Sequence, residues 1–154
     1  YYDKTANGRK IKRWKHPNSN LENLLYKAGW LNHPSTKWLF ESAFNYDWLY
    51  THMMALNEEY KKRYNHKENH ITIQKLGEVL KLPPIKFKNI FEPATEIKPA
   101  MPDYCKIKGD AVASYRKYYI MEKRRFATWK SPAKTPDWYL DGINNLKEKE
   151  CQSQ

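Results

Sequence analysis

A run of about thirty residues without Gly or Pro, from Ser35 to Tyr64, constrains the fold more than any other feature of the chain. It follows Pro34, and proline is well tolerated in the first turn of an α-helix because its missing N–H would have no partner there. The first half of the run is aromatic on nearly every side, which is typical of a central helix. The sequence therefore predicts one long, central helix over 35–64.

Three polar side chains interrupt this aromatic helix. Glu41, Asn45 and His52 share one face at 100° per residue, between Trp38 and Trp48. A carboxylate beside aromatic rings is expected to have a raised pKa, which suits general acid or base catalysis. The three are therefore candidate catalytic residues.

An architectural interpretation of the same face stays open. A buried polar group without a partner costs about 1 to 3 kcal/mol, so such groups usually serve structure. In that case Glu41 would pair with a buried Arg or Lys from the second long helix, and Asn45 would bond to the backbone of an irregular segment.

A second long helix is predicted from Asp110 to Trp129. Its aromatic stripe follows the 3.6-residue period, and most of its cations lie off that stripe. We expect at least half of the rings in this helix and in the N-terminal arm to be buried. The rings of the stripe are Tyr115, Tyr119, Phe126 and Trp129, and Glu122 follows the same period.

The remaining segments predict shorter elements. Asn18 or Ser19 can cap a helix that stops at Gly29, and Thr72 can cap another that ends at Leu82. Residues 83–102 contain five of the nine prolines and read as an extended strap, and 141–154 read as a polar helical tail. Val and Ile are scarce, which disfavours sheets. We expect an all-α, single-domain helical bundle over 1–154, with two long central helices.

The net charge is +11, from 28 Lys and Arg against 17 Asp and Glu, which makes a polyanion the first candidate partner. The alternative is a basic protein without such a partner. Residues 1–15 hold six cations against one Asp, with a turn at Asn7-Gly8, and predict a basic arm or hairpin that contains Trp14. The candidate nucleic-acid-binding residues are Arg9, Lys10, Lys12, Arg13, Arg116, Lys117, Lys123, Arg124, Arg125 and Lys130.

Several classes of protein are disfavoured. Cys105 and Cys151 are too few for a disulfide scaffold. No stretch approaches 18 consecutive apolar residues and the mean hydropathy is −0.97, so we expect no transmembrane helix, and we expect no signal peptide either. No glycine-rich phosphate loop, nucleophile elbow or HExxH motif is present, so neither a cofactor nor a metal is predicted. His66 and His70 could share a metal, but without a third ligand a solvated loop is favoured.

Four segments resemble a known group of proteins: "NHPSTKWLFESAFNYDWLYTHMMALNEEYKKRY", "AMPDY", "SYRKYYIMEKRRFATWK" and "PDWY". They are similar to phage-encoded proteins described as pyrimidine dimer DNA glycosylase-like, distantly similar to bacteriophage endonuclease V, over roughly residues 30 to 139. The resemblance implies a basic, all-α protein that kinks DNA, flips a nucleotide and cuts the glycosidic bond through an imine with an N-terminal amine, assisted by a Glu. The sequence begins at Tyr1, and neither the amine nor that Glu is assigned to a numbered position.

The first functional hypothesis is a DNA-binding protein of this class, acting on a flipped nucleotide in the cytoplasm of an infected host, with no membrane association. Glu41, Asn45 and His52 would then form the floor of the nucleotide pocket. The second is a non-enzymatic phage virion or accessory protein that binds nucleic acid or an acidic protein. A third is a small-nucleotide hydrolase that uses the same polar face.

Overall fold

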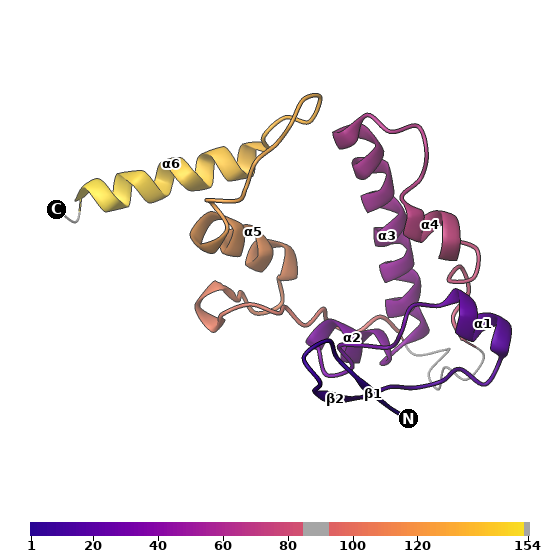
Figure 1. The fold of residues 1–154 in the computed structure, drawn as a ribbon. Helices are drawn as coiled ribbons and strands as arrows, with labels where there is room; N and C mark the ends of the chain where they lie inside the picture. The colour runs from indigo at the N-terminus through magenta and orange to yellow at the C-terminus, as the bar shows by residue number, and fades with distance from the viewer. Residues whose placement is uncertain (85–92, 153–154) are drawn as a thin grey trace.

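The computed structural model describes residues 1–84 and 93–152, and the chain is mainly helical, as predicted (Figure 1). In the described residues the sheet is a single two-stranded hairpin. Residues 85–92 of the predicted strap and 153–154 of the predicted tail lie outside the described ranges. The elements are β1 (Tyr2–Lys4), β2 (Lys10–Lys12), α1 (Ser19–Leu24), α2 (Pro34–Leu39), α3 (Ala43–Tyr64), α4 (Ile71–Leu76), a 3-10 helix η1 (Asp103–Cys105), α5 (Ala111–Glu122) and α6 (Asp137–Gln152).

The predicted single helix over 35–64 is wrong, because the structure divides it into α2 and α3. Ser42 lies between them in an extended conformation, with φ −156° and ψ 147°. Its hydroxyl oxygen accepts a hydrogen bond from the N–H of Phe44 at 3.1 Å, which caps the start of α3. Glu41 therefore lies in the connection between two helices, rather than on one continuous face with Asn45 and His52.

Helix α3 runs for 22 residues beside α4 (Figure 1). The hydroxyls of Tyr46 and Tyr50 donate to the carbonyls of Leu80 and Gly77, at 2.9 and 3.1 Å. These tyrosines hold the 77–80 segment against α3. The buried residues of α3 are nevertheless polar, namely Asn45 and Asn57.

The second long helix is also shorter than predicted, since α5 ends at Glu122 rather than Trp129. The N–H groups of Phe126 and Ala127 both donate to the carbonyl of Lys123, at 2.8 and 2.9 Å, and this shared acceptor closes a turn. Residues 141–152 of the predicted helical tail lie in α6, which begins four residues earlier, at Asp137. Helices α5 and α6 approach so closely that a Cβ on Gly142 would clash with the side chain of Ile120.

Helix caps show where local sequence signals were sufficient. Asn18 caps α1 as predicted, but the helix ends at Leu24, before Gly29. At α4, His70 rather than Thr72 is the cap, because the N–H of Thr72 donates to Nδ1 of His70 at 3.2 Å. The Asn7-Gly8 turn joins β1 to β2, with Gly8 at φ 76°, a conformation that glycine adopts without strain.

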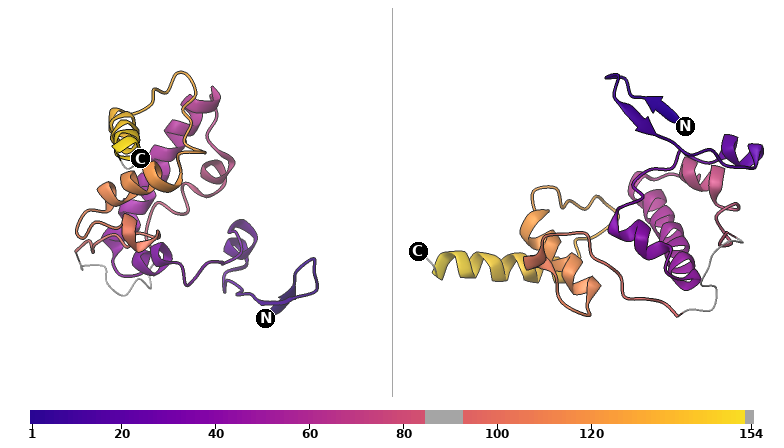
Figure 2. Two further views of the ribbon diagram at one scale, coloured as in Figure 1. Left: turned by 90° about the vertical axis from the view of Figure 1, so that its left-hand side faces the viewer. Right: turned by 90° about the horizontal axis from the view of Figure 1, so that it is seen from below.

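The molecule is open rather than tightly packed. Its accessible surface of 12479 Å² exceeds the about 8,200 Å² expected for a compact monomer of 18.5 kDa. Helix α2 packs on α3 and α5 on α6, while the hairpin projects from one end of the molecule and α6 from the other (Figure 2). The expected burial of at least half of the rings in the arm and the second long helix is wrong: Trp14, Tyr115 and Tyr119 are exposed, and Tyr118 is half-buried. In the described residues, no helix is both long and apolar enough to cross a bilayer.

Candidate nucleic-acid interface and polar site

Asn45 is fully buried and uses both ends of its side-chain amide. Nδ2 donates to the carbonyl of Trp38 and to Oγ1 of Thr95, both at 2.8 Å, and Oδ1 accepts from the N–H of Thr95 at 3.0 Å. The indole N–H of Trp38 donates in turn to the carbonyl of Thr95 at 3.1 Å. Asn45 thus fastens the irregular segment after residue 92 to the junction of α2 and α3, as the architectural interpretation described.

Glu41 is held by the same irregular segment. Its Oε2 accepts from the hydroxyl of Thr95 at 2.8 Å, and its Oε1 forms an ion pair with Lys98. Lys98 first, and the Thr95 hydroxyl second, lower the pKa of Glu41 below its ordinary value. The expected rise in pKa is wrong because these partners outweigh desolvation. The cation comes from the strap, not from the second long helix as predicted.

His52 lies apart from these two residues. Its exposed ring stacks on Trp48, with ring centroids 5.1 Å apart, and Trp48 meets the buried Trp38 edge-on at 5.7 Å. In the described residues, no hydrogen bond joins His52 to Glu41 or Asn45. The three predicted catalytic side chains are therefore one sealed amide, one ion-paired carboxylate and one exposed imidazole.

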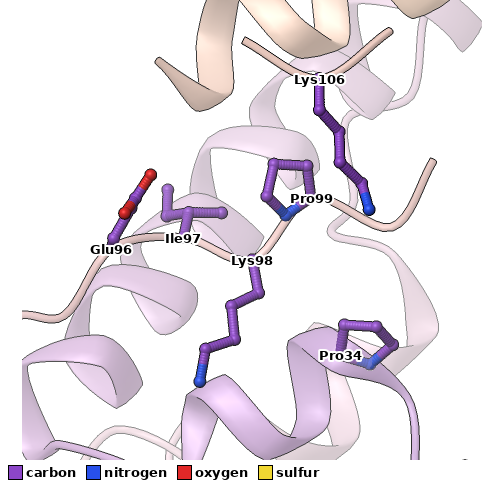
Figure 3. Close-up of a pocket in the computed structure, with 6 residues that line it drawn as sticks. All are labelled: Pro34, Glu96, Ile97, Lys98, Pro99 and Lys106. Atoms are coloured by element: carbon purple, nitrogen blue, oxygen red, sulfur yellow. The ribbon is translucent and has the colours of Figure 1, made fainter. Parts of the chain in front are cut away.

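A hollow of about 370 Å³, shown in Figure 3, is lined by Lys98, the residue that pairs with Glu41. Its polar side chains are Glu96, Lys98 and Lys106, and the rest of its lining is Pro34, Ile97 and Pro99. Figure 3 shows the side chains of Glu96 and Lys98 pointing in opposite directions from the chain. Oε1 of Glu96 accepts from the N–H of Gly109 at 3.1 Å. Glu41 itself does not line the hollow; it is connected to the hollow by its ion pair with Lys98.

A larger groove of about 1060 Å³ lies between the basic hairpin and the chain that connects α1 to α2. We call this the hairpin groove, and define it by residues 9–14 and 28–33, which line it. It contains four of the predicted DNA-binding cations, Arg9, Lys10, Lys12 and Arg13, and none of its lining residues is acidic. None of these four side chains forms an ion pair within the described part of the chain. Their charge is thus available to a partner.

Strand geometry helps to arrange these cations. Side chains alternate across a β-strand, so Lys10 and Lys12 lie on the same face of β2. The antiparallel register places Lys10 opposite Lys4 and Lys12 opposite Tyr2. Nζ of Lys12 also lies 5.6 Å from the ring centroid of Trp14, a cation–π contact. The short hairpin therefore concentrates positive charge beside an aromatic ring.

The cations of the second predicted group, from Arg116 to Lys130, contact other side chains or the backbone of the protein itself. Lys117 donates to the carbonyl of Tyr104, and Arg124 pairs with Glu150 at 3.4 Å. The others contact aromatic rings: Arg116 lies over Trp138, Lys123 over Tyr118 and Phe126, Arg125 over Phe126 and Lys130 over Tyr64. This group stabilises the protein's own structure more than the hairpin cations do.

Sequence reasoning missed Thr95, Lys98 and Trp30. Thr95 and Lys98 lie in a segment without periodicity, so no pattern connected them to Glu41 and Asn45. Trp30 did carry a signal, since it is a large ring in a short loop directly after Gly29. The two loop histidines have structural roles: His70 caps α4, and the ring of His66 stacks on Tyr60 with centroids 5.2 Å apart. Across residues 1–84 and 93–152, no group of three His, Cys, Asp or Glu could hold a metal ion.

The fold and the hairpin groove define a mainly helical protein with an open cationic surface, and a family comparison narrows that class. Residues 10–72 match the family model described as pyrimidine dimer DNA glycosylase. The predicted resemblance to glycosylase-like proteins of this kind, over roughly residues 30 to 139, is thereby confirmed for the part that lies within the match, up to residue 72. The matched range contains β2 to α3 and the three predicted catalytic residues. No curated protein and no solved structure gave a significant match.

Proposed function

We propose that this protein binds DNA through the hairpin groove and acts on a flipped nucleotide in the manner of pyrimidine dimer DNA glycosylases. The observation that carries the proposal is the coincidence of two findings. Lys10, Lys12 and Arg13 lie within the segment that matches the glycosylase family, and with Arg9 they line a groove without a carboxylate. Phosphates are the natural partners of such a surface, because Lys and Arg that neutralise phosphates release the counterions condensed on the DNA.

Salt dependence tests the binding. The logarithm of the association constant for duplex DNA should fall linearly with the logarithm of salt concentration, with a slope of about −0.9 for each phosphate contact. Four contacts by the hairpin cations correspond to a slope of about −3.6. The measurement is fluorescence anisotropy of labelled duplex DNA from 50 to 200 mM salt. A flat response would refute DNA binding by this surface.

We propose that Glu41 is the residue of the polar face that takes part in catalysis, with Asn45 and Thr95 as its positioning residues. Because Lys98 keeps Glu41 ionised, the carboxylate is suited to accept a proton or to stabilise positive charge that develops on a sugar, rather than to donate a proton. Trp38, Trp48 and His52 continue from this site toward the surface as a series of contacting rings.

Substitution Glu41→Gln tests the catalytic role, with strand scission of ultraviolet-irradiated duplex DNA as the readout. The variant should lose scission while its circular dichroism spectrum and its DNA affinity stay close to wild type. Glu58→Gln is a matched control, because Glu58 is also ion-paired, with Lys61 at 2.7 Å, but lies in the second half of α3. Scission by the Glu41→Gln variant at the wild-type rate would remove Glu41 from the mechanism.

A second candidate function is non-enzymatic binding of nucleic acid or of an acidic protein. Asn45 is completely buried and His52 lies apart from Glu41, so the three side chains do not converge on one open site. Catalysis by all three would need such a site, whereas binding through the hairpin groove does not. The same scission assay separates the two functions. Salt-sensitive DNA binding without scission by the wild-type protein favours the non-enzymatic one.

A further inference from the structure

Trp30 is the most exposed of the large hydrophobic residues in the described chain, at 85%. It lies between α1 and α2 with φ 54°, in the left-handed region that bulky residues rarely adopt. Its carbonyl accepts from the N–H of His33 at 2.9 Å, which fixes the turn that precedes α2. The strained backbone costs free energy, and the exposed indole does not offset this cost by packing against the protein. Such strained sites are often functional.

The position of Trp30 suggests what its ring contacts. Trp30 lines the hairpin groove, together with Trp14 and the four cations of the hairpin. The groove volume of about 1060 Å³ slightly exceeds the roughly 300 to 1,000 Å³ of small-molecule pockets, and most of the residues that line the groove are exposed. A cationic groove with accessible aromatic faces matches the surfaces that bind unpaired nucleic-acid strands, in which bases stack on rings and phosphates meet Lys and Arg.

We propose that the hairpin groove binds an unpaired stretch of DNA, with one base stacked on the indole of Trp30 and the neighbouring phosphates on Arg9, Lys10, Lys12 and Arg13. This inference rests on the proposed DNA binding and adds its strand specificity. In a duplex each base face is covered by its neighbours, so stacking on Trp30 requires a base that has left the helix. The groove shares no lining residue with the hollow beside Lys98.

The test measures binding of oligothymidylate and of duplex DNA by wild type and two variants. Trp30→Gly removes the ring and keeps the backbone conformation, because glycine adopts positive φ without strain. Its affinity for oligothymidylate should fall roughly fivefold to 150-fold, the loss of one stacked base, while its salt slope is unchanged. Trp30→Phe keeps a stacking face and should recover most of the affinity. Phe44→Ala removes a ring that is 54% exposed but outside the groove, and should bind like wild type.

Intrinsic tryptophan fluorescence gives a second readout. Oligothymidylate should quench the wild-type emission, and the quenching should shrink in Trp30→Gly, because a stacked base contacts the indole directly. Unchanged oligothymidylate affinity in Trp30→Gly, with salt-sensitive duplex binding intact, would overturn the stacking role and leave the proposed DNA binding standing. Absence of binding to either DNA by wild type would overturn both proposals.

Discussion

The Asn45 network and the hairpin groove contain similar kinds of side chain and use them in opposite ways. Around Asn45, every polar group meets another part of the chain: the amide bonds to Trp38 and Thr95, and Glu41 pairs with Lys98. In the hairpin groove, the ring of Trp30 and three of the four cations are exposed, Arg13 is half-buried, and no carboxylate lines the groove. The first region is satisfied internally, and the second is arranged for a partner.

The two regions differ because burial and exposure place different demands on polar groups. A buried amide must find partners within the fold, since an unpaired buried polar atom is costly. Exposed cations carry no such cost, and isolated surface ion pairs contribute only about 0 to 1 kcal/mol, so leaving them unpaired sacrifices little stability. Substitutions should therefore reduce stability in the first region and binding in the second.

The largest expected effect is on stability, from Asn45→Ala. The substitution leaves the carbonyl of Trp38 and the N–H of Thr95 without their partner, which should lower the free energy of unfolding by about 2 to 4 kcal/mol. Urea denaturation followed by tryptophan fluorescence gives the value. Asn23→Ala, at an exposed position on α1, is the control and should change stability by less than about 0.5 kcal/mol. Equal effects of the two substitutions would show that the Asn45 network does not hold the fold.

The next effect is on binding, from replacement of Arg9, Lys10, Lys12 and Arg13 together by Gln. The salt slope for duplex DNA should become flatter by about 3 to 4, because each removed phosphate contact contributes about 0.9. Thermal stability should change little, because three of the four residues are exposed and none of the four side chains forms an ion pair in the described part of the chain. The matched control replaces the exposed Lys67, Lys81, Lys108 and Lys147 by Gln, which changes the net charge equally. An equal loss of slope in the control would mean that overall charge, not the groove, binds DNA.

The sequence predicted the local features of both regions. The Asn7-Gly8 turn and the surrounding cations indicated the hairpin, and Asn18 and Asp110 indicated helix starts that the structure contains. These signals work because a turn or a cap depends on a few adjacent residues. The groove itself was not predicted, since it also needs residues 28–33, which carry no strand or helix period.

The sequence could not predict the partners of the polar face. Thr95 and Lys98 lie 50 and 57 residues from Asn45 and Glu41 respectively, and helical periodicity says nothing about pairing over such separations. The division at Ser42 was missed for a local reason. Serine fits an uninterrupted helical pattern, yet its hydroxyl can instead cap a new helix, and here the cap prevailed.

A smaller effect should follow from Arg125→Gln, which sharpens the contrast between the two groups of cations. The guanidinium of Arg125 lies 4.3 Å from the ring centroid of Phe126, so its loss should lower stability by about 0.5 to 1 kcal/mol. The salt slope for DNA binding should change by less than about 0.9, the contribution of one phosphate contact. Denaturant unfolding and the anisotropy titration measure both quantities. A large change in slope with no change in stability would place this group at the DNA interface as well.

The smallest expected effect is the pH dependence that Glu41 confers on stability. Its pKa is lowered from 4.5 in the folded protein by Lys98 and Thr95, so its stabilising contribution is complete above pH 4.5 and is lost as pH falls through the folded pKa. A partly exposed ion pair is worth less than about 1 kcal/mol. The unfolding midpoints of wild type and Glu41→Gln should therefore differ slightly at pH 7 and converge below pH 4.5. A gap that widens toward low pH would mean that Glu41 is protonated in the folded state, and that the polar face is poised for proton donation after all.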